Sequence, residues 1–381
     1  NRTERSHGGG LYNVNGASAS LVNCTVENNT AAEHGGGLWN GNTATMTVVH
    51  CTVMSNTAGK DGGGIHNDPN ALDGTGSLTL VNSIVAGSNN PGKGTDLFAA
   101  TSDVTRKGNN LFSDLDNSGL SPGPGILVES LVDLAPLSDR YGGPTEIRLP
   151  LTNSPVVDAG ITPITGLPAD IVFPITDQRG LAREHGATVD LGAVELQPIT
   201  HTVTSISDAG TGSLRDTMEI VSEGSTIDFA PSLTGATITL TGSLRPAVGK
   251  ITIDASALSE GITIACANDR AFNISQPLTL QGLTVADSRG GILLRNGSEL
   301  TMEHCTVRDC SHGGVDLDTA ASLLMRNCTI TGNSLFGLKT RGGTTTLTLE
   351  NCTVANNADN PGLELNGAVT AMLSHTTVYG N

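Results

Sequence analysis

Aromatic side chains are scarce in this chain. They make up only 3% of its 381 residues and include a single tryptophan. Aromatic rings supply much of the buried area of many globular cores, so a broad core of that kind is disfavoured. Glycine, in contrast, occurs 48 times. Because glycine tolerates corners that other residues avoid, the composition favours a narrow core of Val, Leu, Ile, Thr and Cys with many turns.

Positive charge and long apolar runs are also lacking. The chain has 20 Lys and Arg against 37 Asp and Glu, which gives a formal net charge of −17. This balance disfavours nucleic acid or an anionic membrane as a partner. No apolar run approaches the roughly 20 residues that a transmembrane helix needs. Neither a signal peptide nor an initiator Met is present, which predicts a mature or internal piece of a longer protein.

Helical periodicity is almost absent. The exception is the segment Ser213 to Val221, in which Ser213 and Asp216 form a capping box and Leu214 and Met218 share a face. We predict one short helix near 213–222. Such a helix would cover the open end of a β structure and protect its unpaired edge.

A short motif recurs along the chain: an apolar pair, a corner residue, then Cys-Thr-Val. It is found at Cys24-Thr25-Val26, Cys51-Thr52-Val53, Cys305-Thr306-Val307, Cys328-Thr329-Ile330 and Cys352-Thr353-Val354, with Ser83, Leu283 and Thr376 replacing Cys in variant copies. Between positions 283, 305, 328, 352 and 376 the spacing is 22, 23, 24 and 24 residues, and between 24, 51 and 83 it is 27 and 32. A repeat of this period is typical of a solenoid.

In each repeat, apolar residues occur at every second position. One extra residue interrupts this alternation, which then continues. Met46 and Val48 before Cys51 and Val53 are an example. Period two indicates a strand, and the skipped residue indicates a bend that keeps both strands facing inward. The bend residues are Asn23, His50, Asn82, Gly282, His304, Asn327, Asn351 and His375, which are types that tolerate a left-handed backbone. A third short strand follows the glycines, so the pattern predicts an all-β, right-handed parallel β-helix with three strands per coil.

Seven cysteines raise the question of disulfides or a metal site. Five of them occupy the same inward position of successive repeats, where free Cys acts as a small buried hydrophobe. We therefore expect stacked, reduced thiols. Cys310 lies at a place where other coils carry asparagine, and we expect it to be a reduced turn residue.

The segment between the two repeat regions carries four further motifs. They are Gly142-Gly143-Pro144-Thr145, Ser154 to Gly160, Asp177-Gln178-Arg179-Gly180 and Val189 to Glu195. In this order they resemble the carboxy-terminal part of the β-helix domains called choice-of-anchor Q, which occur in large bacterial surface and secreted proteins. Residues 203–229 resemble the opening of such a domain, although the CSLREA sequence that often starts it is missing. The resemblance implies a β-helix and a secreted or cell-surface location in a bacterium.

These patterns predict four regions. Residues 1–92 form the last coils of a first β-helix, and 93–198 its terminal coils and extended tail. Residues 199–250 start a second domain, and 251–381 form its first coils. The register at Asn381 matches the segment that begins at Asn1, so we expect these two assembly ends to continue coil on coil, in a covalent tandem array or by head-to-tail stacking of separate copies.

Many β-helices act on polysaccharides, so the outer faces were searched for acid, base and metal groups. The best set is Asp316 and Asp318 with Lys339 and Arg341 on the next coil. No acidic pair recurs on a neighbouring coil, and we predict that the chain is not an enzyme. The charges of Asp177, Arg179, Arg183 and Asp190 are expected to pin the tail to the β-helix.

Two outward ladders are candidates for ligand binding. Tyr12, Trp39 and His66 share one position of three coils and form the predicted ligand ladder, which suits a sugar. His7, His34 and Asp61 share another position and suit a metal ion, although plain surface decoration explains both ladders equally well. Calcium is compatible with the Asp and Asn turns, but no spacing indicates it, and no cofactor or metal is predicted.

The sequence thus favours a non-catalytic extracellular structural protein, a filament, stalk or adhesive fibre whose main partner is itself. The alternative is a polysaccharide-binding module, or a lyase or hydrolase, on the same fold.

Overall fold

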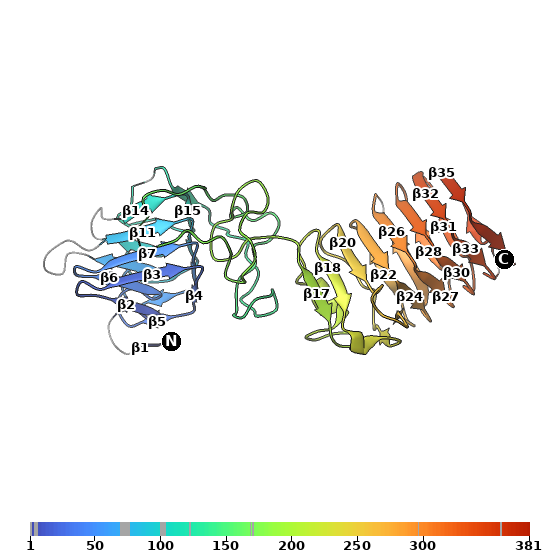
Figure 1. Cartoon of the computed structure of the whole chain (residues 1–381), viewed down its shortest axis with the longest axis horizontal. Coiled ribbons are helices and arrows are strands. Elements are labelled where there is room, and N and C mark those ends of the chain that lie inside the picture. The colour runs from blue at the N-terminus through green and yellow to red at the C-terminus, as the bar shows by residue number, and fades with distance from the viewer. Residues whose placement is uncertain are drawn as a thin grey trace. The chain divides into compact units, whose positions relative to one another are not determined.

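A computed structural model describes residues 2–3, 7–68, 77–99, 104–121, 123–167, 169, 171–295, 297–358 and 360–381. The chain divides into two compact units, Asn1–Leu196 and Gln197–Asn381 (Figure 1). The sequence places the corresponding boundary between residues 198 and 199. Each unit contains a right-handed parallel β-helix, which confirms the predicted fold class.

The second unit has three parallel sheets, one for each side of the coil. The first sheet runs in the order β17 (Thr200–Val203), β18 (Thr226–Phe229), β20 (Ile251–Asp254), β23 (Leu278–Gln281), β26 (Glu299–Glu303), β29 (Ser322–Arg326), β32 (Thr344–Glu350) and β35 (Ala368–Ser374). The second contains β19 (Thr237–Thr239), β21 (Ile262–Ala265), β24 (Leu283–Ala286), β27 (Thr306–Arg308), β30 (Thr329–Thr331), β33 (Thr353–Ala355) and β36 (Thr377–Tyr379). The third contains β22 (Arg270–Ile274), β25 (Gly290–Leu294), β28 (Val315–Leu317), β31 (Leu338–Thr340) and β34 (Leu363–Glu364).

The first unit repeats this plan over fewer coils. Its sheets are β2 (Leu11–Asn13), β6 (Leu38–Gly41), β10 (Ile65–Asp68) and β13 (Leu97–Ala99); β3 (Ser18–Val22), β7 (Thr45–Val49), β11 (Ser77–Val81) and β14 (Val104–Lys107); and β4 (Thr25–Glu27), β8 (Thr52–Met54), β12 (Ile84–Ala86), β15 (Asn110–Phe112) and β16 (Ile126–Val128). A short fourth sheet joins β1 (Arg2–Thr3), β5 (Thr30–Ala31) and β9 (Thr57–Ala58). Neighbouring strands of each sheet in Figure 1 thus belong to successive coils of the β-helix.

The corner residues adopt the conformation that the sequence predicts. Asn23 has φ 52°, His50 has φ 46° and Gly282 has φ 65°, and the other predicted corners are likewise left-handed. This backbone bends the chain by skipping one residue, so that Val48 before the corner and Cys51 after it are both fully buried. The interior is consequently a stack of like residues, Val53 pairing with Val26 and Val85 in the neighbouring strands.

A ladder of amide side chains lines one inner corner of the second unit. Asn333 donates through Nδ2 to Oδ1 of Asn357 over 2.9 Å, and Asn357 donates to Oδ1 of Asn381 over 2.8 Å. The backbone amide of Cys310 donates to Oδ1 of Asn333, so Cys310 occupies the ladder position of its own coil. All seven cysteines are free, and only Cys24 is not fully buried, which confirms the expectation of stacked, reduced thiols.

The predicted helix is present but shorter than expected. α1 spans Leu214–Met218, with Ser213 as its N-cap accepting a hydrogen bond from the amide of Asp216. Leu214, Met218 and Val221 pack into the core of the second unit together with Val203 of β17, the edge strand of its sheet. A second short helical turn, the 3₁₀ helix Pro231–Leu233, was not predicted.

Residues 129–196 contain no strand among the described positions and run as a tail along the first unit. Some of the charged side chains in this tail are buried: Arg179 pairs with Asp177 over 2.9 Å, and Nη2 of Arg183 lies 2.7 Å from the side-chain oxygen of Asn23 at a β-helix corner. The amide of Gly192 donates to the carbonyl of Asn82, another corner. Of the four predicted charges, Arg183 attaches the tail to a coil. Among the described residues, the side-chain hydrogen bonds of Asp177, Arg179 and Asp190 lie within the tail itself, so these charges hold the tail together and the prediction is confirmed for Arg183 alone.

Candidate functional site

Left-handed glycines place one group of polar and aromatic residues on the outside of the first unit. His7, His34 and Asp61 directly precede Gly8, Gly35 and Gly62, which have φ 64°, 66° and 65°. A Cβ on Gly35 would lie 2.5 Å from the carbonyl oxygen of Leu38 and 2.8 Å from Cβ of Trp39. Only glycine fits there. The turn therefore holds the residue before each glycine close to the ring that follows the glycine by four positions. These rings are Tyr12, Trp39 and His66.

The predicted ligand ladder forms, and its rings stack on one another. Tyr12, Trp39 and His66 are direct neighbours in the register of β2, β6 and β10. The centroids of Tyr12 and Trp39 lie 4.7 Å apart with an interplanar angle of 11°, and those of Trp39 and His66 lie 6.5 Å apart at 13°. Phe98, which the sequence analysis missed, continues the ladder on β13 at 4.9 Å from His66.

This stacking leaves little aromatic surface for a ligand. Trp39 is 7% exposed and His66 3%, whereas Tyr12, at the end of the stack, is 51% exposed. The face of each inner ring is covered by the ring of the next coil. A sugar could therefore stack only on the face of Tyr12 or contact the edges of the other rings. Sugar binding at this ladder stays a prediction, and the geometry offers it a single platform rather than a track.

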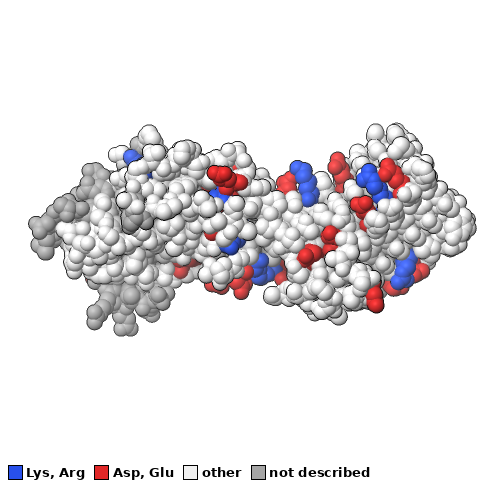
Figure 2. All heavy atoms as spheres, viewed as in Figure 1, with Lys and Arg blue, Asp and Glu red and all other residues white. Residues whose placement is uncertain are grey.

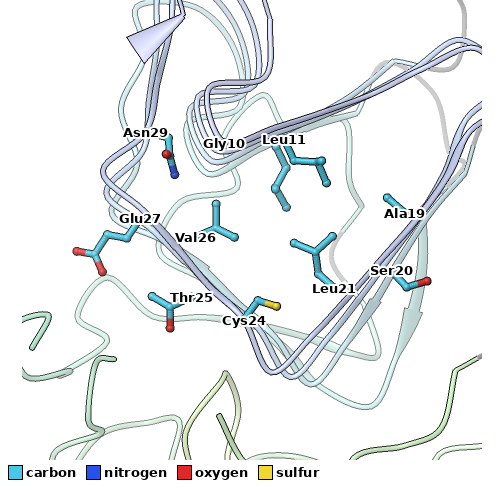
Figure 3. A pocket seen from close by; sticks show the side chains of 11 residues that line it. Gly10, Leu11, Ala19, Ser20, Leu21, Cys24, Thr25, Val26, Glu27 and Asn29 are labelled. Carbon is cyan, nitrogen blue, oxygen red and sulfur yellow. The ribbon is translucent and has the colours of Figure 1, made fainter. Parts of the chain in front are cut away.

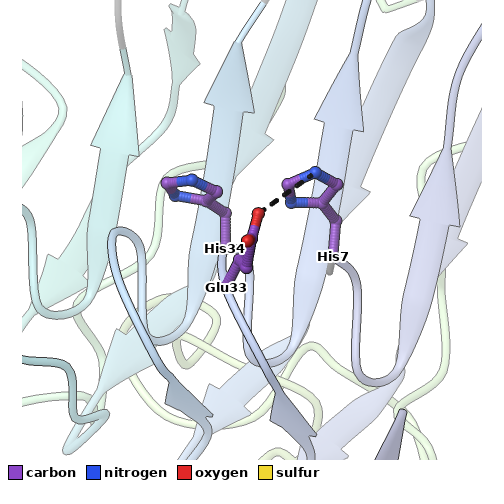
Figure 4. Close-up of side chains that lie close together, drawn as sticks. All are labelled: His7, Glu33 and His34. Carbon is purple, nitrogen blue, oxygen red and sulfur yellow. Dashed lines mark ion pairs between the residues drawn. The ribbon is translucent and has the colours of Figure 1, made fainter. Parts of the chain in front are cut away.

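A second group lies beside the ladder: His7, Glu33 and His34, whose ligand atoms all lie within 4.8 Å of one another (Figure 4). Nε2 of His7 is 4.0 Å from a carboxylate oxygen of Glu33, and the two imidazole centroids are 5.2 Å apart. Figure 4 shows the carboxylate of Glu33 between the two rings. We call these three residues the His–Glu–His cluster.

Neighbouring charges hold the cluster in a defined state. Asp61 lies on the next coil, with Oδ2 3.3 Å from Nδ1 of His34. Lys60 contacts the carboxylate of Glu33 at 2.9 Å, and its ammonium lowers the pKa of Glu33. Partial burial and the proximity of His34 lower the pKa of His7. These shifts favour the neutral form of the His7 imidazole and the ionised form of the Glu33 carboxylate.

Sequence reasoning identified His7, His34 and Asp61 but missed Glu33. The signal was present, because Glu33 precedes His34 as Lys60 precedes Asp61, in equivalent turns of successive coils. Glu33 lies in a turn, and its side chain was not expected to point towards His7 and His34.

The best catalytic candidate from the sequence is fully engaged in ion pairs. The side chain of Asp316 is inaccessible to solvent and accepts hydrogen bonds from Nη2 of Arg270 at 2.9 Å and from Nε of Arg341 at 2.8 Å. Lys339 is paired with Glu364 at 2.9 Å. A carboxylate held by two guanidinium groups has no lone pair directed at a substrate, so the set does not form an acid–base site.

Arg270 also borders a hollow of about 190 Å³, lined by Asp269, Arg289, Gly290 and His312. These residues come from successive coils on one side of the second unit. Elsewhere on the face of this unit seen in Figure 2, basic side chains lie beside acidic ones, as the pair of Arg326 and Glu350 does.

A larger hollow, of about 640 Å³, is the open interior of the first coil (Figure 3). Leu11, Leu21 and Val26 point into it from three sides, and Cys24 lies at the corner. β2, β3 and β4, which carry these residues, are each the edge strand of a sheet.

The predicted assembly ends differ in what can be described. Asn1 lies outside the described residues. Asn381 belongs to the amide ladder, where its Oδ1 accepts from Asn357 and its Nδ2 donates to the carbonyl of Val354 over 3.1 Å. Its coil exposes Leu373 and Val378 on the last strands, β35 and β36.

Among the described residues, no helix is long and apolar enough to span a membrane. The family described as "right handed beta helix region" matches residues 236–381. No curated protein matches the chain.

A solved structure of a mutant of the PL6 family alginate lyase AlyGC is similar at a TM-score of 0.28 and 10% identity. The match covers 89% of this chain and 62% of the lyase chain, so the chain spans less than two thirds of the lyase. A likeness of this size carries no argument about activity. What the family match and the strand pairing establish is that the chain is a parallel β-helix repeat protein.

Proposed function

We propose that the chain is a structural β-helix protein of a bacterial surface or secreted assembly, which builds a stiff rod by stacking the last coil of one copy on the first coil of the next. The observation that carries this proposal is the match between the two end coils. Both present open strand edges, and their inward residues are identical at four positions, with Cys24 matched by Thr376 at the fifth.

The match can be followed position by position. The inward residues of the first coil are Leu11, Ala19, Leu21, Cys24 and Val26, and the equivalent residues of the last coil are Leu363, Ala371, Leu373, Thr376 and Val378. Like residues stack throughout the interior of both units. A last coil placed on a first coil would therefore continue the same columns of side chains and the same parallel ladders.

Exposure of these residues supports the same proposal. Leu373 is 42% exposed and Val378 45%, and the first coil opens onto the hollow of Figure 3. Apolar residues next to unpaired strand edges are a template for adding another strand. A contact between two different ends is heterologous, so it propagates along a fibre instead of closing a dimer.

The proposal is tested with two variants, each blocked at one end. Leu21→Lys places a charge in the first coil and Leu373→Lys places one in the last coil. Each variant alone is expected to sediment as a monomer at concentrations where the unmodified chain forms oligomers. A mixture of the two should form a dimer in 1:1 ratio, because each variant retains one functional end.

The control is Thr348→Lys, on β32 at an outward position of the second unit. It should assemble like the unmodified chain. Oligomers of either blocked variant alone, or no oligomers of the unmodified chain at any concentration, would refute head-to-tail stacking.

The hollow at Arg289 favours a second candidate function, binding of an acidic polysaccharide. Arg270, Arg289 and His312 gather there in a chain whose net charge is −17. Guanidinium groups bind carboxylates strongly, and Arg289 is the one offered to a uronate here, because Arg270 is paired with Asp316. Affinity electrophoresis in a polyuronate gel should show retardation that is lost in Arg289→Ala, and equal mobility of both proteins would reject this candidate.

A further inference from the structure

We propose that the His–Glu–His cluster of His7, Glu33 and His34 binds a divalent transition-metal ion of the Zn²⁺ class on the outer face of the first unit. This inference is independent of head-to-tail stacking, because the ligands lie on the side of the coils. No ligand comes from the hollow at the first coil.

The ligand set has the right chemistry for such an ion. Two imidazoles and one carboxylate are the groups that hold Zn²⁺ at about 2.0–2.2 Å, with a fourth position left for water. Imidazole nitrogen excludes the hard cations Ca²⁺ and Mg²⁺, which prefer oxygen alone. The three ligands come from two successive coils, so the ion would cross-link neighbouring turns of the solenoid.

The distances require only a small closure. Ligand atoms at a tetrahedral Zn²⁺ ion lie about 3.3 Å apart, given bonds of about 2.0–2.1 Å. Here they lie within 4.8 Å. All three residues are partly exposed, and rotation of the Glu33 side chain brings its carboxylate closer to Nε2 of His7, now 4.0 Å away. The two stacked imidazoles, whose centroids are 5.2 Å apart, would also have to turn towards the ion.

Two features around the cluster support the assignment. Nδ1 of His34 accepts a hydrogen bond of 3.3 Å from the backbone amide of Asp61, and Oδ2 of Asp61 lies at the same distance. Metal binding through Nε2 would require the tautomer in which Nδ1–H donates to that carboxylate instead. Nδ1 of His7 is buried and has no hydrogen-bond partner among the described residues, so Nε2 is the nitrogen of His7 that faces the other ligands.

Among the described residues, Lys60 opposes binding. Its ammonium is 2.9 Å from the carboxylate of Glu33 and would have to be displaced by the ion. The Lys60 side chain is 54% exposed, and exposed ion pairs of this kind are weak. Lys60 is therefore a weak competitor of a metal ion at this site.

The test is isothermal titration calorimetry of the full chain with ZnCl₂ at pH 7.5, under reducing conditions. We expect one site per chain. His7→Ala and His34→Ala should each weaken binding by at least tenfold, and Asp61→Asn by about 10–100-fold, as for other second-layer carboxylates. Lys60→Met should bind Zn²⁺ more tightly, because it frees Glu33.

Two further measurements keep the result interpretable. His185→Ala, an exposed histidine of the same unit, is the matched control and should bind as the unmodified chain does. Co²⁺ should give visible absorption typical of four-coordinate N and O ligation, and this absorption should vanish in His34→Ala while circular dichroism stays unchanged. Binding that is equal in all variants, or no heat of binding up to millimolar Zn²⁺, overturns the proposal.

Discussion

Nη2 of Arg183 donates a hydrogen bond of 2.7 Å to the side-chain oxygen of Asn23, although 160 residues separate them. Asn23 is a left-handed corner of the first β-helix, and Arg183 belongs to the tail that leaves it. Arg183 also donates to the carbonyl of Gly192 and lies 3.8 Å from Glu195. One guanidinium thus joins the corner, the tail and the last motif of the tail.

Arg183→Met should destabilise the first unit strongly. The buried oxygens of Asn23 and Gly192 would lose their donor, and such losses cost about 3 kcal/mol or more when a charge is involved. Urea denaturation of the full chain should show the transition of the first unit shifting to lower urea. Arg326→Met removes an exposed pair with Glu350 and should change stability by less than about 1 kcal/mol. Equal effects of the two substitutions would contradict this role of Arg183.

The stability of the first unit should fall as the pH rises from about 4 to about 8. Burial, with the nearby Asp190 carboxylate, raises the pKa of Glu195 to about 8, and burial raises the pKa of Asp190 to about 6. Between the unfolded values, near 4, and these folded values, the folded state binds more protons than the unfolded state. The free energy of unfolding therefore decreases as pH rises through this range, until both groups have ionised.

Glu195→Gln isolates this effect, because the amide does not titrate. We expect the unmodified chain to lose more stability than the variant between pH 6 and pH 9, in denaturation curves measured at both values. A loss of equal size in the variant would mean that Glu195 is already ionised in the folded chain at pH 6.

The amide ladder of the second unit makes a separate contribution to stability. Asn357 is buried, and its Oδ1 accepts from the backbone amide and from Nδ2 of Asn333. Asn357→Ala would leave the backbone amide of Asn333 unsatisfied, at a cost of about 1–3 kcal/mol, whereas Nδ2 of Asn333 keeps the carbonyls of Val307 and Thr331 as acceptors. Thermal unfolding of the second unit should reveal this loss, whereas Asn360→Ala at an exposed turn should be neutral. An unchanged midpoint in Asn357→Ala would show that water replaces the ladder.

Trp39 provides an optical probe of the aromatic stack, because it is the single tryptophan. It is 7% exposed, and its ring lies between those of Tyr12 and His66. We expect a blue-shifted emission and weak quenching by acrylamide. Neutral and acidic polysaccharides should leave the emission unchanged. A saturable change would show that a sugar reaches Trp39 and would favour sugar binding along the whole ligand ladder.

Much of the coil geometry could be predicted because each residue type acts locally. Asn23 and His50 are left-handed corners since their side chains tolerate that backbone, and the period-two pattern on either side fixes which residues point inward. Equal spacing also placed Tyr12, Trp39 and His66 in one register. What the sequence could not show is that the rings cover one another, because burial of Trp39 depends on the space above Gly41, where a Cβ would lie 1.9 Å from the ring.

The charged groups could be predicted less well, because their partners lie far away in the sequence. Asp316 was paired by sequence reasoning with the next coil, yet Arg270, 46 residues earlier, also reaches it. Gly290 makes this possible: a Cβ there would lie 3.1 Å from Cγ of Arg270. The small size of Gly290 thus allows Arg270 to reach Asp316 in addition to Arg341.

Electron microscopy of the purified chain at increasing concentration tests the central claim most directly. The account predicts unbranched filaments in which copies join end to end and coils about 4.8 Å apart continue from one copy into the next. It also predicts that Leu373→Lys gives only single copies. Single copies of the unmodified chain at every concentration, or filaments in which copies contact side by side, would contradict it.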